Sequence, residues 1–181
     1  GLPKIKMNLS TKGSFSMGAA GAPQAHLKST PNKYGEEQVV MKEDFAKMTA
    51  GTPENPDLDN SILKEEFEYP WINTKDEYFN TPGWGSGNAY SAGGVVYLAS
   101  APKEMAHINT PMLNVSANGG IAWVRFKARA KSAEELPVVM VEAAETHNMS
   151  PTWDMMGSAQ LPQISEQWQE YTMYFYGGGE Y

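Results

Sequence analysis

The sequence predicts an all-β protein preceded by an irregular N-terminal arm. The expected fold is a jelly-roll β-sandwich of two antiparallel sheets, of the galactose-binding-like or concanavalin-like fold type. Three observations predict this fold. Short extended runs recur along the chain, and turn residues close each of them. The run 121–130 (IAWVRFKARA) alternates strictly, so one of its faces is expected to be buried and the other turned outward. Helical periodicity is not sustained, and there is no repeat of 20–50 residues.

The run 121–130 also sets the expected orientation of single residues. Val124, Phe126 and Ala128 are expected in the core, and Trp123 and Arg125 on the opposite face. Segment 61–69 admits a helical turn or two or an extended course. Asn118-Gly119-Gly120 is expected to form a tight turn. The predicted strands in chain order are 38–45, 90–99, 108–115, 121–130, 137–144 and 168–176.

The N-terminal segment differs from the rest of the chain. Residues 1–37 mix Ser, Thr, Gly, Ala, Pro and Lys with little periodicity, which is typical of a linker or arm. Ile5, Met7 and Leu9 alternate with polar residues, so a short edge strand is possible there. We therefore predict an arm or linker over 1–37 and the sandwich domain over 38–181.

Composition excludes several classes of function. The chain has 181 residues, a net charge of −7 and no cysteine. Its acidity and the lack of a basic run disfavour nucleic acid as a partner. Disulfides, Cys-ligated zinc and thiol catalysis are excluded. No stretch approaches the ~18 apolar residues of a membrane span. A start at Gly1 instead of Met suggests a processed or tag-cleaved chain, from which any signal peptide is expected to have been removed.

Several short motifs resemble those of the choice-of-anchor J modules of bacterial cell-surface proteins, which are similar to cleaved-adhesin and MAM-like domains. These modules open on a Glu-Asp-Phe strand, carry Gly-Trp in a loop, and enter a later strand through Thr-Pro-x-Leu-x-Val-Ser. The resemblance covers about residues 38–181, but the family's closing strand with paired Asp is not matched before Glu180-Tyr181. The matching residues are Glu43, Asp44, Phe45, Gly83, Trp84, Thr110, Pro111, Leu113, Val115 and Ser116.

The resemblance implies a non-catalytic module, secreted or at the bacterial cell surface, that binds a glycan or a host or matrix protein. Two alternatives stay open: a structural spacer within a larger adhesin or surface assembly, and an accessory domain of a secreted peptidase or glycoside hydrolase. The residues themselves do not spell out a catalytic site. His26, His107 and His147 stand alone, and the serine of GWGSGN lacks the strand–turn–helix setting of a nucleophile.

Acidic residues suggest a metal site. Glu43 and Asp44 end the first predicted strand, and Asp57 and Asp59 lie in the loop after it. Hard oxygen ligands suit Ca²⁺, although no EF-hand pattern is present. Related jelly rolls hold one structural calcium near their first strand. The open alternative is that these residues only form turns.

Aromatic residues suggest a ligand site. Trp71, Trp84, Tyr90, Trp123 and Trp153 fall in predicted loops or on an outward face. Aromatic rings stack on the apolar faces of sugars, and Arg or Asn hydrogen-bonds sugar hydroxyls. The candidate ligand-binding residues are therefore Trp84, Tyr90, Trp123 and Arg125, on a shallow surface. The alternative is that the tryptophans fill the core or cap its ends.

Overall fold

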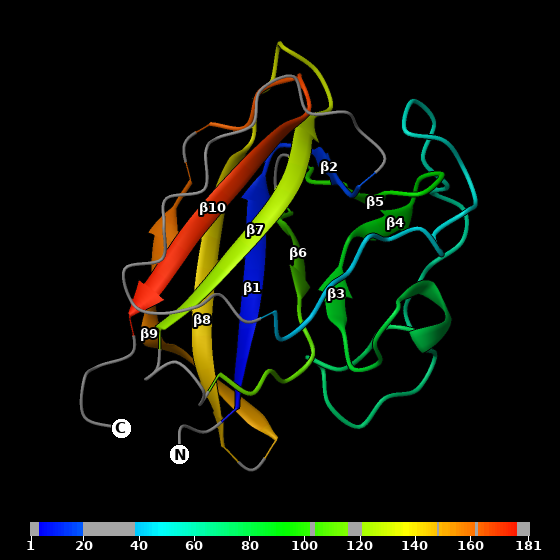
Figure 1. The fold of residues 1–181 in the computed structure, drawn as a ribbon. Coiled ribbons are helices and arrows are strands. Elements are labelled where there is room, and N and C mark those ends of the chain that lie inside the picture. The colour runs from blue at the N-terminus through cyan, green and yellow to red at the C-terminus, as the bar shows by residue number, and fades with distance from the viewer. Residues whose placement is uncertain are drawn as a thin grey trace.

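The computed structural model describes residues 4–19, 39–101, 104–115, 121–147, 149–161 and 163–176. Within them the chain forms two antiparallel five-stranded sheets and one turn of 3-10 helix, η1 (Asp76–Tyr78). Figure 1 shows β10 and β7 crossing in front of β8 and β1, as the two layers of a β-sandwich. The predicted all-β sandwich is confirmed. No helix among the described residues is long and apolar enough to cross a membrane.

Consecutive strands repeatedly change sheet, so each sheet is assembled from distant parts of the chain. Sheet A has the order β3-β6-β1-β8-β9, and sheet B the order β10-β7-β2-β5-β4. The strands are β1 (Ile5–Lys12), β2 (Phe15–Met17), β3 (Gly85–Gly87), β4 (Ala89–Ser91), β5 (Val96–Leu98), β6 (Ala106–Asn109), β7 (Ile121–Ala130), β8 (Val138–His147), β9 (Ser150–Gln160) and β10 (Gln169–Tyr176).

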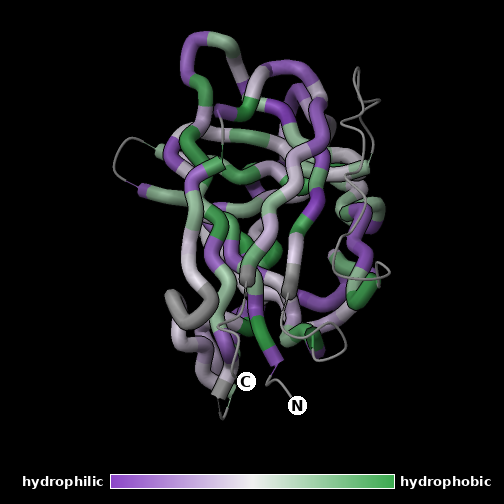
Figure 2. Tube along the Cα trace, turned by 60° about the vertical axis from the view of Figure 1, so that its left-hand side comes forward, coloured by the Kyte–Doolittle hydropathy of each residue, from purple (hydrophilic) through white to green (hydrophobic). Residues whose placement is uncertain are grey.

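The core lies between the sheets, because each strand turns its apolar residues inward at every second position. Figure 2 shows hydrophobic and hydrophilic residues alternating along the strands. In β7, Phe126 and Ala128 are buried and Val124 packs against the core, whereas Arg125 lies on the other face. The predicted register of β7 is therefore confirmed. Full burial of a Val or Phe side chain contributes about 1.5–3 kcal/mol.

The prediction of an arm over 1–37 is wrong for the first part of that segment, which forms strands β1 and β2. β1 pairs with both β6 and β8, and β2 with both β5 and β7, so both strands lie within sheets and not at an edge. Polar residues of β1 such as Lys6 and Asn8 suggested an edge in water, but they are buried on the outer face of sheet A. Residues 20–37 lie outside the described part of the chain, as does the Asn118-Gly119-Gly120 turn.

Two predicted strands have a different form. The described part of 38–45 is not a strand: Val39 is 56% exposed, and Phe45 has φ +58°. The Glu43 carboxylate accepts a hydrogen bond from Phe45 N at 2.9 Å. This side-chain hydrogen bond takes the place of backbone pairing with a neighbouring strand. The run 90–99 is a hairpin of β4 and β5, because Gly93 and Gly94 both take positive φ between them.

Three further differences concern the middle and the end of the chain. Segment 61–69 contains no helix and contributes only a bridge from Leu63 to Thr74. The third predicted strand ends at Asn109, where Thr110 Oγ1 accepts a hydrogen bond from Met7 N and Pro111 has no N–H to donate. Strand β9 was not predicted, because its Pro and Gly residues are typical of turns.

Candidate ligand-binding groove

A row of polar side chains crosses the outer face of sheet A. In the register of the sheet, Asn8 of β1 lies opposite Asn109 of β6 on one side and opposite Glu142 of β8 on the other. The adjacent row on that face pairs Ser10 with His107. Residues directly opposite each other on neighbouring strands share a face, so these side chains form one polar floor.

Two tryptophans stand beside this floor. Trp71, from the loop between Leu63 and Gly83, and Trp153, from β9, line a groove of about 540 Å³ together with the floor residues. The ring of Trp71 stacks on that of Tyr69, with centroids 5.4 Å apart. The floor and the two tryptophans, hereafter the sheet A groove, comprise Asn8, Ser10, Trp71, His107, Asn109, Glu142 and Trp153.

Glycines of β3 allow the loop to approach the sheet. A Cβ atom on Gly85 would collide with the carbonyl of Trp71 and lie 2.7 Å from Asn109 Oδ1. A Cβ atom on Gly87 would lie 2.6 Å from Cε1 of His107. The Gly-Ser-Gly sequence of β3 therefore makes room both for the Trp71 wall and for two side chains of the floor.

The floor has unused hydrogen-bonding capacity. Asn109 is only 3% exposed, and its Oδ1 has no hydrogen-bond partner; the buried indole N–H of Trp71 also lacks one. Burial lowers the pKa of His107 from its ordinary value, so at neutral pH its imidazole offers one donor and one acceptor. The groove therefore combines amide, imidazole and carboxylate groups between two large rings.

A buried lysine lies beneath the Trp71 wall. Lys6 of β1 has an exposed fraction of 0%, and its Nζ donates to Trp71 O at 2.6 Å and to Gly83 O at 3.4 Å. Burial lowers the pKa of its ammonium from 10.5 to about 7. Within the described chain its ammonium makes no ion pair, so its hydrogen bonds to carbonyls offset part of the cost of burying the charge.

Trp84 is not the exposed ring that the sequence suggested. Its exposed fraction is 4%; its ring stacks on Phe79 with centroids 4.8 Å apart and meets Phe45 edge-on at 5.7 Å. Trp84 therefore belongs to the core. This is the alternative in which the tryptophans fill the core or cap its ends. Tyr90 lies on β4 and packs against a second, smaller apolar cluster around Tyr97, apart from the sheet A groove.

Trp123 and Arg125 do meet, but on sheet B. The Arg125 guanidinium carbon lies 4.5 Å from the centre of the Trp123 ring, and the ring of Tyr174 on β10 is 6.5 Å from it. Tyr174 is 38% exposed, whereas Trp123 and Arg125 are half-buried. Arg125 Nε also lies 3.6 Å from a carboxylate oxygen of Glu170. These side chains lie together on a different sheet from the groove, and Trp123 and Arg125 also border the cavity between the two sheets.

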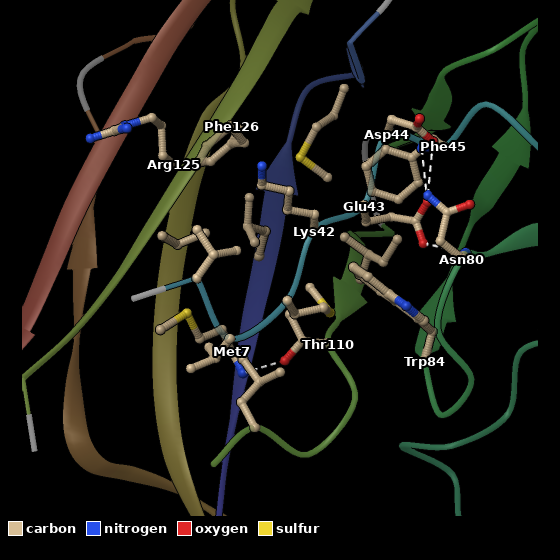
Figure 3. Close-up of a pocket in the computed structure, with 18 of the residues that line it drawn as sticks. Met7, Lys42, Glu43, Asp44, Phe45, Asn80, Trp84, Thr110, Arg125 and Phe126 are labelled. Carbon is tan, nitrogen blue, oxygen red and sulfur yellow. Dashed lines mark hydrogen bonds between the residues drawn. The ribbon is translucent and has the colours of Figure 1, made fainter. Parts of the chain in front are cut away.

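A second cavity lies between the sheets. It measures about 570 Å³ and is lined mainly by apolar side chains of both sheets, with segment 39–45 along one side. Figure 3 shows Phe126, Met7, Phe45 and Trp84 around it, and Arg125 pointing away from it. At its edge, Glu43 and Asp44 both accept hydrogen bonds from Asn80. Its lining also includes Lys42 and three of the predicted ligand residues, Trp84, Trp123 and Arg125.

The four acids of the calcium prediction do not form one ligand set. Glu43 and Asp44 hold the Asn80 loop, and the hydrogen bond from Ala46 N, followed by that from Asn80, lowers the pKa of Asp44. Asp57 instead accepts hydrogen bonds from Asp59 N and Asn60 in its own turn. Across the described ranges, no group of three or more His, Asp or Glu is placed to hold a metal ion. Calcium stays a prediction.

No protein-family model matches the chain, and searches of curated proteins and of solved structures also return no match. Function is therefore inferred from the residues themselves. Sequence patterns pointed to Trp71 and Trp153 only as loop or surface aromatics, and did not point to Asn8, Asn109 or Glu142 as site residues. The one available signal was the alternation of polar residues along β1.

Proposed function

We propose that the chain is a non-catalytic carbohydrate-binding module whose ligand lies in the sheet A groove. Two features support a sugar. The rings of Trp71 and Trp153 offer apolar surfaces on which the C–H face of a pyranose packs. Between them, Asn8, Asn109 and Glu142 present polar groups in a row, as the hydroxyls of a sugar require.

The observation that carries the proposal is the composition of the groove. Asn8, Ser10, His107 and Glu142 line it together with two tryptophans. Their amide, hydroxyl, imidazole and carboxylate groups each hydrogen-bond hydroxyl groups readily. An apolar ligand would cover these polar groups without pairing them, at a cost of about 1–3 kcal/mol for each group left unpaired. The groove therefore favours a polyhydroxylated partner.

The setting that we propose for this activity is the bacterial cell surface or the extracellular space, as the motif resemblance implies. A glycan of the host or of the matrix is then the partner. A structural spacer, or an accessory domain beside a secreted peptidase or glycoside hydrolase, are the alternatives. The spacer has no need of a groove with polar floor and aromatic walls.

A glycan array with the purified chain, followed by calorimetry on each hit, tests the proposal. Trp153→Ala and Asn8→Ala should each weaken binding about tenfold, because stacking or one good hydrogen bond is worth about 1.4 kcal/mol. Trp123→Ala is the matched control, since it removes a half-buried tryptophan from sheet B. No reproducible hit would favour the spacer. A loss confined to Trp123→Ala would move the site to sheet B.

A further inference from the structure

Lys6 is the most unusual polar residue of the fold. A lysine with no exposed surface is rare, because burying its charge is expensive unless it is paired. It faces outward from β1 in the row next to that of Asn8, opposite Ala144 of β8. Its ammonium donates to carbonyls of the 71–83 loop, which carries one wall of the groove.

We propose that Lys6 is the positioning residue of the sheet A groove: its ammonium holds the Trp71 turn against the sheet and thereby sets the place of the aromatic wall. This inference rests on the proposed function. Lys6 is not a ligand contact, since it lies beneath the wall and is not among the residues that line the groove. It acts through the carbonyl of Trp71, at 2.6 Å.

The geometry makes the wall depend on the charge of Lys6. A charged donor forms a hydrogen bond roughly twice as strong as a neutral one. The lowered pKa of about 7 places the change from ammonium to amine near neutrality. As pH rises through this range, the Trp71 carbonyl is held less tightly. The affinity for the ligand should then fall several-fold.

The other titratable groups near the groove do not account for the expected fall in affinity between about pH 6.5 and about pH 8.5. Glu142 lies on the same face of β8, His107 on β6, and Asp76 accepts a hydrogen bond from Gly83 N in the loop. Burial of Lys6 alone, without a charged neighbour, accounts for its lowered pKa. His107 has a pKa below 6.5, so it titrates at lower pH than Lys6.

The test uses an array hit and the full chain, with affinities measured by calorimetry at about pH 6.5 and about pH 8.5. The wild-type affinity should fall about three- to fivefold over this range. Lys6→Met should remove the pH dependence, and His107→Gln should keep it. A pH dependence that survives in Lys6→Met would overturn the proposal while leaving the proposed function intact.

A measurement without ligand keeps the test independent of glycan binding and of the folding of Lys6→Met. In the wild-type chain, the indole N–H resonance of Trp71, assigned with Trp71→Phe, should titrate with a midpoint at about pH 7. The indole of Trp168, next to sheet B, is the internal control. A Trp71 resonance that stays constant across this range would overturn the proposal. If it titrates but no glycan binds at any pH, the positioning role stands and the proposed function fails.

Discussion

The burial of Lys6 predicts an unusual dependence of stability on pH. The folded pKa of about 7 lies below the ordinary value of 10.5, so between these pH values the unfolded chain binds a proton that the folded chain has lost. Stability rises with pH wherever the unfolded state binds more protons. The Lys6 contribution to the free energy of unfolding should therefore be lowest below pH 7 and grow toward pH 10.5.

The size of the effect follows from the shift. Each pKa unit is worth about 1.36 kcal/mol, so burying the ammonium costs roughly 4–5 kcal/mol below pH 7. At about pH 9 the unfolded lysine is still protonated and the folded one is not, which reduces the cost to roughly 2 kcal/mol. The difference between pH 6 and pH 9 is then about 2.5 kcal/mol, or roughly 5–10 °C in Tm for a chain of this length.

Urea denaturation of the wild type and of Lys6→Met at both pH values measures this difference. The wild type should gain about 2.5 kcal/mol relative to Lys6→Met between pH 6 and pH 9, since methionine has no proton to lose. Lys12→Met, at the exposed end of the same strand, is the control: it keeps Lys6, so the wild type should show no such gain relative to this variant. Parallel pH profiles for the wild type and Lys6→Met would refute the reasoning.

Three further predictions concern the core, the groove and the acidic loop. Phe126→Ala should cost about 3–5 kcal/mol in urea denaturation, and a loss below about 1 kcal/mol would contradict its place in the core. Gly85→Ala should destabilise the fold by about 1–3 kcal/mol and weaken glycan binding. Both effects should be larger than those of Gly87→Ala, because the new Cβ atom collides with the Trp71 backbone in Gly85→Ala but with the movable His107 ring in Gly87→Ala. If Glu43 and its neighbours hold calcium, millimolar calcium should raise Tm above its value in EDTA; identical melting curves would end the calcium prediction.

The fold was predictable where one face of a strand is apolar and the other polar. The run 121–130 became β7 with the same bounds, because its alternation over ten residues fixes both the strand and its register. β1 was predicted only as a short edge strand. Its outward residues Lys6 and Asn8 are polar, and sequence alone does not tell a polar face in water from one covered by a loop.

The groove could not be predicted from the sequence for a related reason. Asn8, Asn109 and Glu142 are far apart in the chain and become neighbours only through the pairing of β1 with β6 and β8. Each is unremarkable on its own strand. The predicted exposure of Trp84 was wrong, because flanking glycines suit an exposed ring and a buried ring equally.

Chemical-shift mapping with a saccharide from the glycan array shows on which sheet the ligand lies. We expect the amide resonances of Asn8, His107, Asn109 and Glu142 and the indoles of Trp71 and Trp153 to shift with ligand concentration. The resonances of Trp123 and Tyr174 on sheet B should stay unchanged. Shifts confined to Trp123, Arg125 and Tyr174, with an undisturbed sheet A groove, would contradict the account.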